Sequence, residues 1–289
     1  MRLFVPNYYD SFRCIAERCR HNCCIGWEID IDPDTAELYR QIGGDFGLRL
    51  KNAVSNDGEP HFILKENDRC PFLNEKGLCD IITELGDGAL CDICADHPRY
   101  RNYVGYDLEM GLGLCCEEAA RLILSQREKV RLIDADTGDA APLSEERRAL
   151  LLKLQDREIP FEKRLSTLFT PPITDPFTLL SSLERLDPSW DDRLALLKEE
   201  GGADLSEFDI EFEQLAVYFF LRHGAENPDL GFSFALFSVY IIRKIAAVIK
   251  KQKGTLDFDT LADVCRMYSS EIEYSDTNTE EVVDRLNNE

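Results

Sequence analysis

The sequence has few basic residues for its length. It carries 33 Lys and Arg against 55 Asp and Glu, which gives a formal net charge of -22 over 289 residues. A surface of this sign repels nucleic-acid phosphates and anionic membranes, so we expect neither as a partner. A lysine-bearing protein would be attracted, although a solvated acidic surface explains the charge at least as well.

The sequence also lacks a secretion signal and a long uncharged apolar segment. Residues 1–6 contain no apolar core of a signal peptide, so we expect a cytoplasmic protein. The most apolar stretch, residues 231–242, runs into Arg243 and Lys244 and is shorter than the roughly 20 residues that cross a bilayer. We therefore expect no membrane insertion and a buried helix here.

Nucleotide-binding and hydrolase motifs are missing as well. There is no Walker loop, no G-x-G-x-x-G after a strand and no G-x-S-x-G elbow. A dinucleotide fold or an ordinary Rossmann methyltransferase fold therefore finds no support. The hydrophobic fraction of 44% and charged fraction of 30% are typical of a soluble globular protein, as one body or as two domains.

Cysteine, by contrast, is abundant and clustered. Four of the 11 cysteines fall within residues 14–24, and only Cys265 lies beyond residue 120. In a reducing cytosol, clustered cysteines indicate metal binding or catalysis rather than disulfides. Burial as small apolar side chains explains Cys265 but not the cluster.

The spacing of the cysteines bears on the kind of metal. Zinc sites usually combine two short C-x2–4-C pairs, whereas the ligands of an iron–sulfur cluster are spaced more variably. The intervals here are x4, x3 and x0, then x8 between Cys70 and Cys79, and x2 between Cys91 and Cys94. This irregularity favours iron and sulfur without excluding zinc.

Local patterns predict the elements of the N-terminal part. Alternation of apolar and acidic residues predicts a short strand over 27–32, and Pro33 predicts a helix that ends near Gly43. Residues 46–64 predict paired strands around a turn at 56–58. A second hairpin would bring Cys70 and Cys79 together, and one or two helical turns follow at 81–85.

The remaining chain reads as a hairpin followed by helices. Residues 99–114 predict the hairpin, and Glu117 and Glu118 favour a helix start that would stabilise a thiolate at Cys115 or Cys116. A hydrophilic break at 134–142 suggests a domain boundary. We therefore predict a mainly α protein with small β hairpins: a cysteine-rich metal-binding module, residues 1–133, packed on a helical domain, residues 143–289.

The acidic residues fall into two groups. Glu28, Asp30 and Asp32 lie on one side of the predicted strand and favour a solvated edge. Glu271 and Glu273 lie near the end of the chain, where the pattern alone favours a solvated acidic turn capped by Ser275.

Several motifs together form a recognisable pattern. They are Cys14, Cys19, Cys23 and Cys24 before residues 26–32, Cys70 with residues 71–73, residues 78–81, Cys94 before Pro98 and Arg99, Cys116 before residues 119–122, and the terminal Tyr268, Ser269, Glu271, Ile272, Glu273, Ser275 and Asn278. With these motifs the sequence resembles the bacterial flagellin lysine-N-methylase family across most of its length. Its cysteine half is also similar to zinc- or iron-chelating cysteine-cluster proteins.

The resemblance implies methyl transfer from S-adenosylmethionine to surface lysines of flagellin, in a protein that carries a [4Fe–4S] cluster. Cys91, Cys115 and Cys265 are expected to be bystanders. The expected metal-region thiols are Cys14, Cys19, Cys23, Cys24, Cys70, Cys79, Cys94 and Cys116. Eight thiols exceed the four of one cluster, so either a second site exists or some of them do not bind the metal.

The terminal motif supplies the expected catalytic residues. Glu271 and Glu273 are predicted to capture the lysine and accept its proton, with Tyr268 beside them. Trp27 and Asn278 are predicted to contact the cofactor, Trp27 as an aromatic wall and Asn278 as a hydrogen-bond donor. This requires the motif to fold against residues 27–32. Radical chemistry is disfavoured because the usual C-x3-C-x2-C triplet is absent.

Two classes of function remain in competition. As an enzyme, the protein would be a protein-lysine N-methyltransferase. As a non-catalytic module, it would bind zinc or an iron–sulfur cluster for metal handling or partner binding. The terminal motif, far from the cysteines, favours the enzyme.

Overall fold

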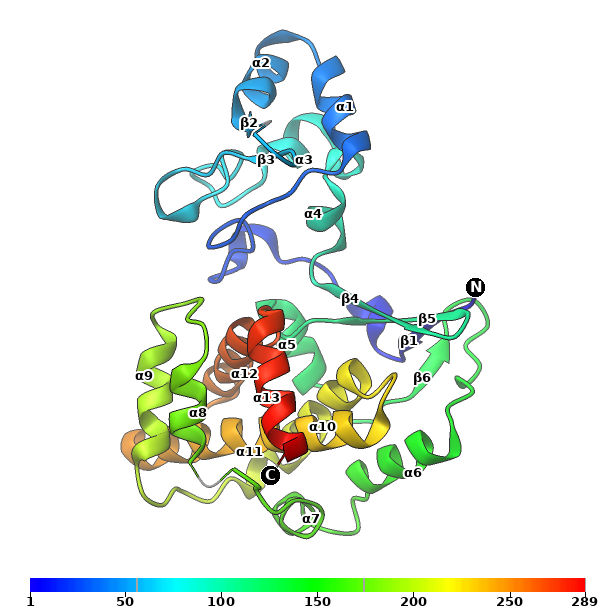
Figure 1. The fold of residues 1–289 in the computed structure, drawn as a ribbon, viewed down its shortest axis with the longest axis vertical. Coiled ribbons are helices and arrows are strands. Elements are labelled where there is room, and N and C mark those ends of the chain that lie inside the picture. The colour runs from blue at the N-terminus through cyan, green and yellow to red at the C-terminus, as the bar shows by residue number, and fades with distance from the viewer. Residues whose placement is uncertain (56, 174, 289) are drawn as a thin grey trace. The chain divides into compact units, whose positions relative to one another are not determined.

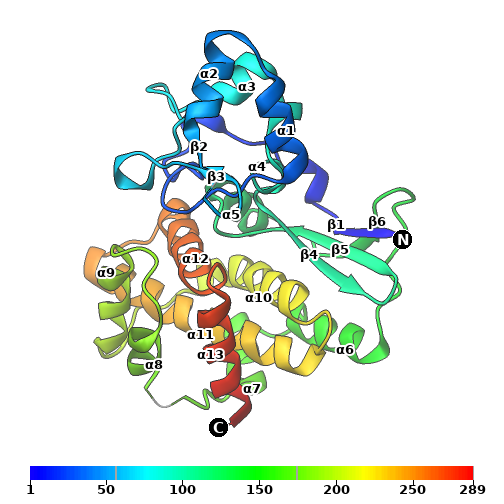
Figure 2. The ribbon, with the colours of Figure 1, turned by 45° about the horizontal axis from the view of Figure 1, so that its top comes forward.

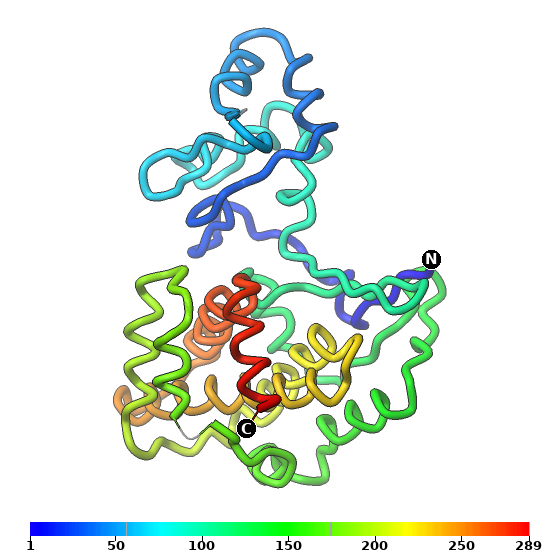
Figure 3. Tube along the Cα trace, in the orientation of Figure 1, coloured from blue at the N-terminus to red at the C-terminus, as the bar shows by residue number. Residues whose placement is uncertain are grey.

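The computed structural model describes residues 1–55, 57–173 and 175–288 and has a mainly α fold with small sheets, as the sequence predicts (Figure 1). The chain divides into two compact units. The cysteine unit is Arg13–Pro98, and the helical unit combines Met1–Phe12 with Arg99–Glu289. Figure 3 traces the chain through both units in colours that follow residue number.

The cysteine unit consists of short helices and one two-stranded sheet. Its elements are α1 (Pro33–Gln41), α2 (Gly44–Ala53), β2 (Val54–Ser55), β3 (His61–Phe62), α3 (Asp80–Leu85) and α4 (Asp92–Asp96). Helix α1 begins as predicted, because Pro33 occupies its first turn and the Asp32 carboxylate accepts the Thr35 amide at 2.8 Å.

The prediction of strands over residues 46–64 is wrong for its first half. Residues 44–53 form α2, and only β2 and β3 pair, with Val54 opposite Phe62. The predicted turn residue 56 lies outside the described residues. Phe46, Leu50 and Ala53 recur at helical spacing, and Leu50 is fully buried. Burial of this face therefore favours a helix over the predicted strand.

The predicted strand at residues 27–32 is extended but pairs only locally. Asp30 bridges to His61, and the Phe62 amide donates to the Ile29 carbonyl at 3.0 Å. Ile29 and Ile31 are buried, whereas Glu28 and Asp30 are exposed, so the solvated acidic edge is confirmed for these two carboxylates.

The helical unit contains a four-stranded sheet in the order β4-β5-β1-β6. Its strands are β1 (Leu3–Pro6), β4 (Arg99–Val104), β5 (Asp107–Leu112) and β6 (Leu132–Asp134). The predicted hairpin over residues 99–114 is confirmed by β4 and β5 (Figure 2). Strand β1 pairs parallel with β5 and antiparallel with β6, so the first strand of the chain lies inside the sheet.

Helices make up the rest of the helical unit. They are α5 (Glu117–Leu124), α6 (Glu145–Leu154), α7 (Phe161–Leu168), α8 (Pro176–Ser182), α9 (Trp190–Ala195), α10 (Asp209–His223), α11 (Pro228–Lys253), α12 (Phe258–Ile272) and α13 (Asp276–Asn288). Ser144 and Asp175 cap α6 and α8, where their side chains accept backbone amides.

The core of the helical unit is built around α10 and α11, which pack against each other. Helix α11 continues through Arg243 and Lys244 for 26 residues, so the expectation of a short segment is wrong. By length and composition alone α11 could cross a membrane, but 67% of its apolar window is buried inside the structure. The predicted buried helix is therefore confirmed.

The compact units differ from the predicted domains, 1–133 and 143–289. Pairing of β1 with β5 and β6 ties both ends of residues 1–134 to the helical unit. Helix α5 also packs against α10 and α12. The hydrophilic residues 134–142 are a connection within this unit, where the Ala141 amide donates to the Leu132 carbonyl at 2.9 Å.

Candidate functional site

The cysteine unit brings six thiols into mutual electrostatic contact. Hydrogen bonds join Cys24 to Cys23 and to Cys70. They raise the pKa of Cys24 and lower the pKa of Cys23. They also lower the pKa of Cys70, to about 7. A second pair joins Cys91 and Cys94, and Cys94 also senses the charges of Cys70 and Cys23. Cys79 lies close enough to Cys70 for its pKa to be raised by it, after the larger effect of burial.

This gathering contains five of the predicted ligands and one predicted bystander, Cys91. Thiols of this kind suit zinc or an iron–sulfur cluster. Among the described residues, however, no group of three or more His, Cys, Asp or Glu side chains is arranged to hold a metal ion. Cys24 is hydrogen-bonded to both Cys23 and Cys70, and Cys91 to Cys94, so the donor chemistry fits a metal, and a bound metal stays a prediction.

The other predicted ligands are Cys14 and Cys19, in the same unit, and Cys116. The Cys14 sulfur accepts the Ala16 amide at 3.4 Å, and the Cys19 thiol donates to the His21 carbonyl at 3.2 Å. Cys116 belongs to the helical unit, where it directly precedes α5 without a capping hydrogen bond from its side chain. A single metal region of eight thiols stays a prediction.

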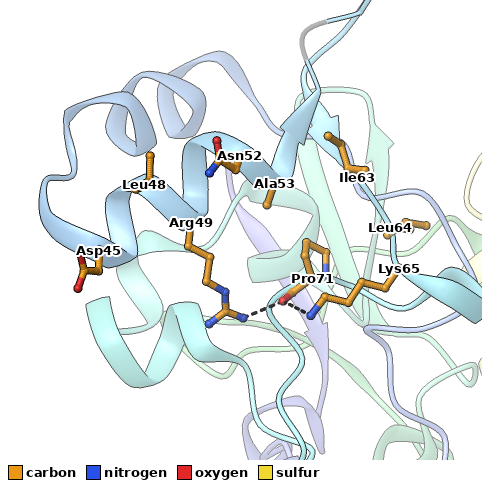
Figure 4. Close-up of a pocket in the computed structure, with 9 residues that line it drawn as sticks. All are labelled: Asp45, Leu48, Arg49, Asn52, Ala53, Ile63, Leu64, Lys65 and Pro71. Atoms are coloured by element: carbon orange, nitrogen blue, oxygen red, sulfur yellow. Dashed lines mark hydrogen bonds between the residues drawn. The ribbon is translucent and has the colours of Figure 1, made fainter.

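Two open cavities lie in the cysteine unit. One, of about 530 Å³, is lined by Leu48, Ile63 and Lys65 among others, and Arg49 and Lys65 both donate to the Pro71 carbonyl at its edge (Figure 4). The second, of about 590 Å³, is bordered by Trp27, the predicted cofactor contact. The predicted contact between Trp27 and the cofactor stays a prediction, because an open cavity beside a side chain does not identify what binds there.

The structure places Glu273, a predicted catalytic residue, in a buried network of the helical unit. Its side chain is 0% exposed and accepts a hydrogen bond from the Tyr218 hydroxyl at 3.0 Å. The Arg222 Nε lies 3.1 Å and the His223 Nε2 lies 2.7 Å from the same carboxylate oxygen. The prediction of a solvated acidic turn is therefore wrong, because α10 and α12 enclose this carboxylate.

Electrostatics keep the Glu273 carboxylate ionised. Burial alone would raise its pKa, but the charge of Arg222 and the hydrogen bond from His223 outweigh burial, and the pKa lies below its usual value. Burial lowers the pKa of His223 despite the nearby carboxylate. The pair is therefore an ionised carboxylate beside a neutral imidazole at neutral pH.

Aromatic rings hold Arg222 in place. Its guanidinium lies 5.3 Å from the Tyr100 ring centroid and 5.4 Å from that of Tyr274. Tyr274 also contacts Cys115, whose pKa burial raises to about 12. Desolvation therefore outweighs the helix terminus at Cys115, so of the two alternatives predicted, Cys115 and Cys116, Cys115 is not favoured as a thiolate.

Glu271, the second predicted catalytic carboxylate, organises a neighbouring loop. It is 1% exposed and accepts from Arg185 at 2.6 Å and from the backbone amides of Leu186 and Asp187 at 3.1 and 3.0 Å. These donors occupy both carboxylate oxygens. A role in lysine capture stays a prediction, and it would require this loop to move.

Tyr268 and Asn278 are likewise part of the interior. The Tyr268 hydroxyl donates to Ser238 at 2.9 Å, and its ring meets Trp190 edge-on. The side-chain amide of Asn278 donates to the backbone carbonyls of Glu184 and Glu271 at 2.9 and 2.8 Å, and the residue is 0% exposed. The Ser275 hydroxyl accepts the backbone amide of Asn278 at the start of α13, whereas the sequence pattern predicted that it caps a solvated acidic turn.

Sequence reasoning missed the residues of α10 that surround Glu273. Tyr218 and Arg222 are four residues apart in the C-terminal half of α10, which is otherwise apolar from Leu215 to Leu221, and His223 follows at its end. Polar groups spaced by four within an apolar helix share a face, and this signal could have pointed to a buried site.

Comparison with known proteins places the chain in a family. It is 30% identical over 158 residues to proteins named lysine-N-methylase from Salmonella typhimurium and Salmonella choleraesuis, which covers 50% of this chain and 39% of each relative. It is also 30% identical over 135 residues to the flagellar biosynthetic protein FliU of Salmonella muenchen, covering 44% of this chain and 79% of that protein. No family model and no solved structure matches.

These similarities define the chain as a relative of proteins named lysine-N-methylase. It belongs to the lysine-N-methylase family that includes FliU. The match spans 39% of the length of the two lysine-N-methylases.

Proposed function

We propose that this protein methylates lysine side chains of flagellin, using S-adenosylmethionine as the methyl donor. The observation that carries the proposal is the similarity to proteins named lysine-N-methylase and FliU. The net charge of -22 would attract a lysine-bearing surface electrostatically. The Glu273 network provides acid–base groups of the kind that such a reaction needs.

The chemistry sets clear demands on the site. A lysine ammonium has no free electron pair, so it must lose a proton before it can attack a methyl sulfonium. The amine must then lie opposite the leaving sulfur, and water must be excluded. Proton acceptors and aromatic faces are the side chains that meet these demands, the latter by cation–π attraction of ~0.5–2 kcal/mol.

We further propose that the cysteine unit binds a [4Fe–4S] cluster, with zinc as the alternative. The thiols that lie together there, Cys23, Cys24, Cys70, Cys79, Cys91 and Cys94, would supply the ligands. A bound centre would supply binding energy for folding. No step of the methyl transfer is assigned to it.

The test is an assay of purified, metal-loaded protein with purified flagellin and S-adenosylmethionine. We expect mass increments of one or more methyl groups on flagellin lysines, located by peptide mass spectrometry. Calorimetry should detect binding of S-adenosylmethionine. Metal-loaded protein that binds no S-adenosylmethionine and modifies no lysine would contradict the proposal and favour a metal-binding module.

A further inference from the structure

His223 presents an imidazole whose orientation is set by buried partners. It is the last residue of α10, and its ring centroid lies 4.3 Å from that of Phe234 on α11. Its Nε2 lies 2.7 Å from Oε1 of Glu273, at the end of α12. Three helices therefore fix this ring, while 16% of the side chain stays exposed.

The partner of Nε2 determines which ring nitrogen carries the proton. An ionised carboxylate only accepts hydrogen bonds, so Nε2 must be the protonated nitrogen. In the neutral ring Nδ1 then holds the lone pair. Within the described part of the chain no hydrogen bond engages Nδ1, so its lone pair is available to a ligand.

The donors around Glu273 keep the carboxylate in place. The Tyr218 hydroxyl donates to it and itself accepts the Leu114 amide at 3.2 Å and Arg222 Nη1 at 3.0 Å. Arg222 Nη2 also donates to the Glu273 carbonyl at 3.2 Å. The carboxylate can therefore neither rotate away from His223 nor leave the network without breaking several hydrogen bonds.

From this geometry we infer that His223 is the general base of the methyl transfer, with Glu273 as its positioning residue; the inference rests on the proposed function. An Nζ–H bond of the substrate lysine breaks and the proton bonds to Nδ1 of His223, leaving the electron pair on Nζ. Nζ then bonds to the methyl carbon of the sulfonium while the carbon–sulfur pair passes to sulfur, giving a thioether. His223 afterwards releases the proton to water.

The surroundings also act on the incoming lysine. Its ammonium has a pKa of ~10.4 in water. Loss of water and the positive charge of Arg222 both favour the neutral amine and so lower the pKa of the lysine ammonium. This narrows the difference between its pKa and that of the imidazole that accepts the proton. Arg222 itself is held by Tyr100 and Tyr274 and by Glu273, so it stays in place as a fixed positive charge.

The first test replaces the ring and supplies it from solution. His223→Ala should lower the turnover of flagellin lysines by about 10²–10⁴-fold, the usual contribution of a general base. Because the side chain is partly exposed, added imidazole should restore a substantial part of the rate. Affinity for S-adenosylmethionine, measured by calorimetry, should change little, which separates loss of the base from loss of the fold.

The second test follows pH. The charged groups that act on His223 are Glu273 and Arg222, while α11 places the uncharged Phe234 ring beside it. In the pH profile of the wild type, kcat/KM should rise as His223 loses its proton, at a pH below the usual histidine pKa. The profile of His223→Ala should lack this rise. Glu273→Gln should shift the rise and lower kcat, whereas the exposed Glu281→Gln should match wild type.

The third test does not depend on turnover. The protein has only 4 histidines, so nitrogen NMR of labelled protein can resolve the tautomer of His223. We expect the form protonated at Nε2, and Glu273→Gln should mix the two tautomers. A neutral ring protonated at Nδ1 would overturn the inference.

The outcomes separate the two proposals. If wild type methylates flagellin and His223→Ala retains its turnover without added imidazole, the general-base role is wrong and the proposed function stands. If wild type methylates no lysine, the proposed function fails and the role of His223 fails with it.

Discussion

The carboxylate of Glu273 is charged although it is fully buried, because Arg222, His223 and Tyr218 compensate for the water that it loses. A buried charge of this kind is costly once its partners are removed, since the remaining charge is then left without compensation. The same reasoning applies to Arg222, which depends on Glu273 and two aromatic rings.

We predict that Glu273→Gln lowers the free energy of unfolding at pH 7 by about 3–5 kcal/mol. The folded-state pKa of Glu273 is lowered, so its contribution is present above the unfolded pKa near 4.5 and is lost as pH falls through the folded value. The difference in unfolding free energy between the variant and the wild type should therefore shrink below pH 4.5. Urea unfolding at several pH values measures it, and a difference independent of pH would contradict the prediction.

Glu271 offers a contrasting prediction. Glu271→Gln keeps the shape of the side chain but removes the carboxylate to which Arg185 and two backbone amides donate hydrogen bonds. We therefore expect the free energy of unfolding to fall by about 1–3 kcal/mol. Exposed Glu281→Gln is the control. Unchanged stability with abolished methyl transfer would instead support the catalytic role that the sequence predicts.

At the scale of secondary structure, Gly231 sets the approach of α10 to α11. A Cβ at this position would lie 2.2 Å from the Cα of Gly224 and 2.6 Å from the carbonyl carbon of His223. Both contacts are with backbone, which cannot turn aside as a side chain can. The end of α10, with His223 on it, therefore depends on this glycine.

Gly231→Ala should lower the free energy of unfolding by about 1–3 kcal/mol, because it overfills a packed contact. It should also reduce methyl transfer, since His223 moves with the end of α10. The matched control is Gly88→Ala, where a Cβ meets nothing within 4 Å. Circular dichroism during thermal unfolding gives the comparison, and equal melting of the two variants would refute the argument.

Elements were predictable where local chemistry determines them. Asp32 with Pro33, Ser144, and Asp175 with Pro176 each mark a helix start that the structure confirms. Helix α2 was missed because Phe46, Leu48 and Leu50 alternate like a strand, although Leu48 is 61% exposed. Only tertiary burial distinguishes the two patterns at that length.

The site was predictable only in part. Glu273 was selected from the terminal motif, but His223 lies 50 positions away in sequence, and no local pattern links the two residues. Their contact depends on how α10 and α12 pack. Burial of Glu271, Tyr268 and Asn278 follows from the same packing, so the sequence located the motif without revealing which of its side chains face inward.

At the scale of the whole molecule, the two units have separate cores, and the clustered thiols belong to the cysteine unit. That core is small, including Phe62, Phe72 and Tyr39 among its larger members. Small domains often depend on a metal for stability, since they bury little apolar surface.

We predict that removing bound metal with a chelator under anaerobic conditions raises hydrogen exchange in residues 13–98 and leaves residues 99–288 nearly unchanged. Cys24→Ser and Cys70→Ser should lower the iron, sulfide or zinc content of the purified protein. Cys265→Ser, in the buried face of α12, should not. Equal metal content in all three variants, or a uniform rise in exchange, would count against a metal-stabilised cysteine unit.

The position of β1 inside the sheet has a consequence for synthesis on the ribosome. Strand β1 ends at Pro6, whereas its partner β5 begins at Asp107, so roughly 100 residues must be translated before the two can pair. At about 5–20 residues per second this takes about 5–20 s. During that interval Phe4 and Val5 are without their sheet, while the whole of the cysteine unit emerges. The nascent chain therefore carries an unpaired apolar strand through much of its early translation, and it is then most exposed to chaperones and to aggregation.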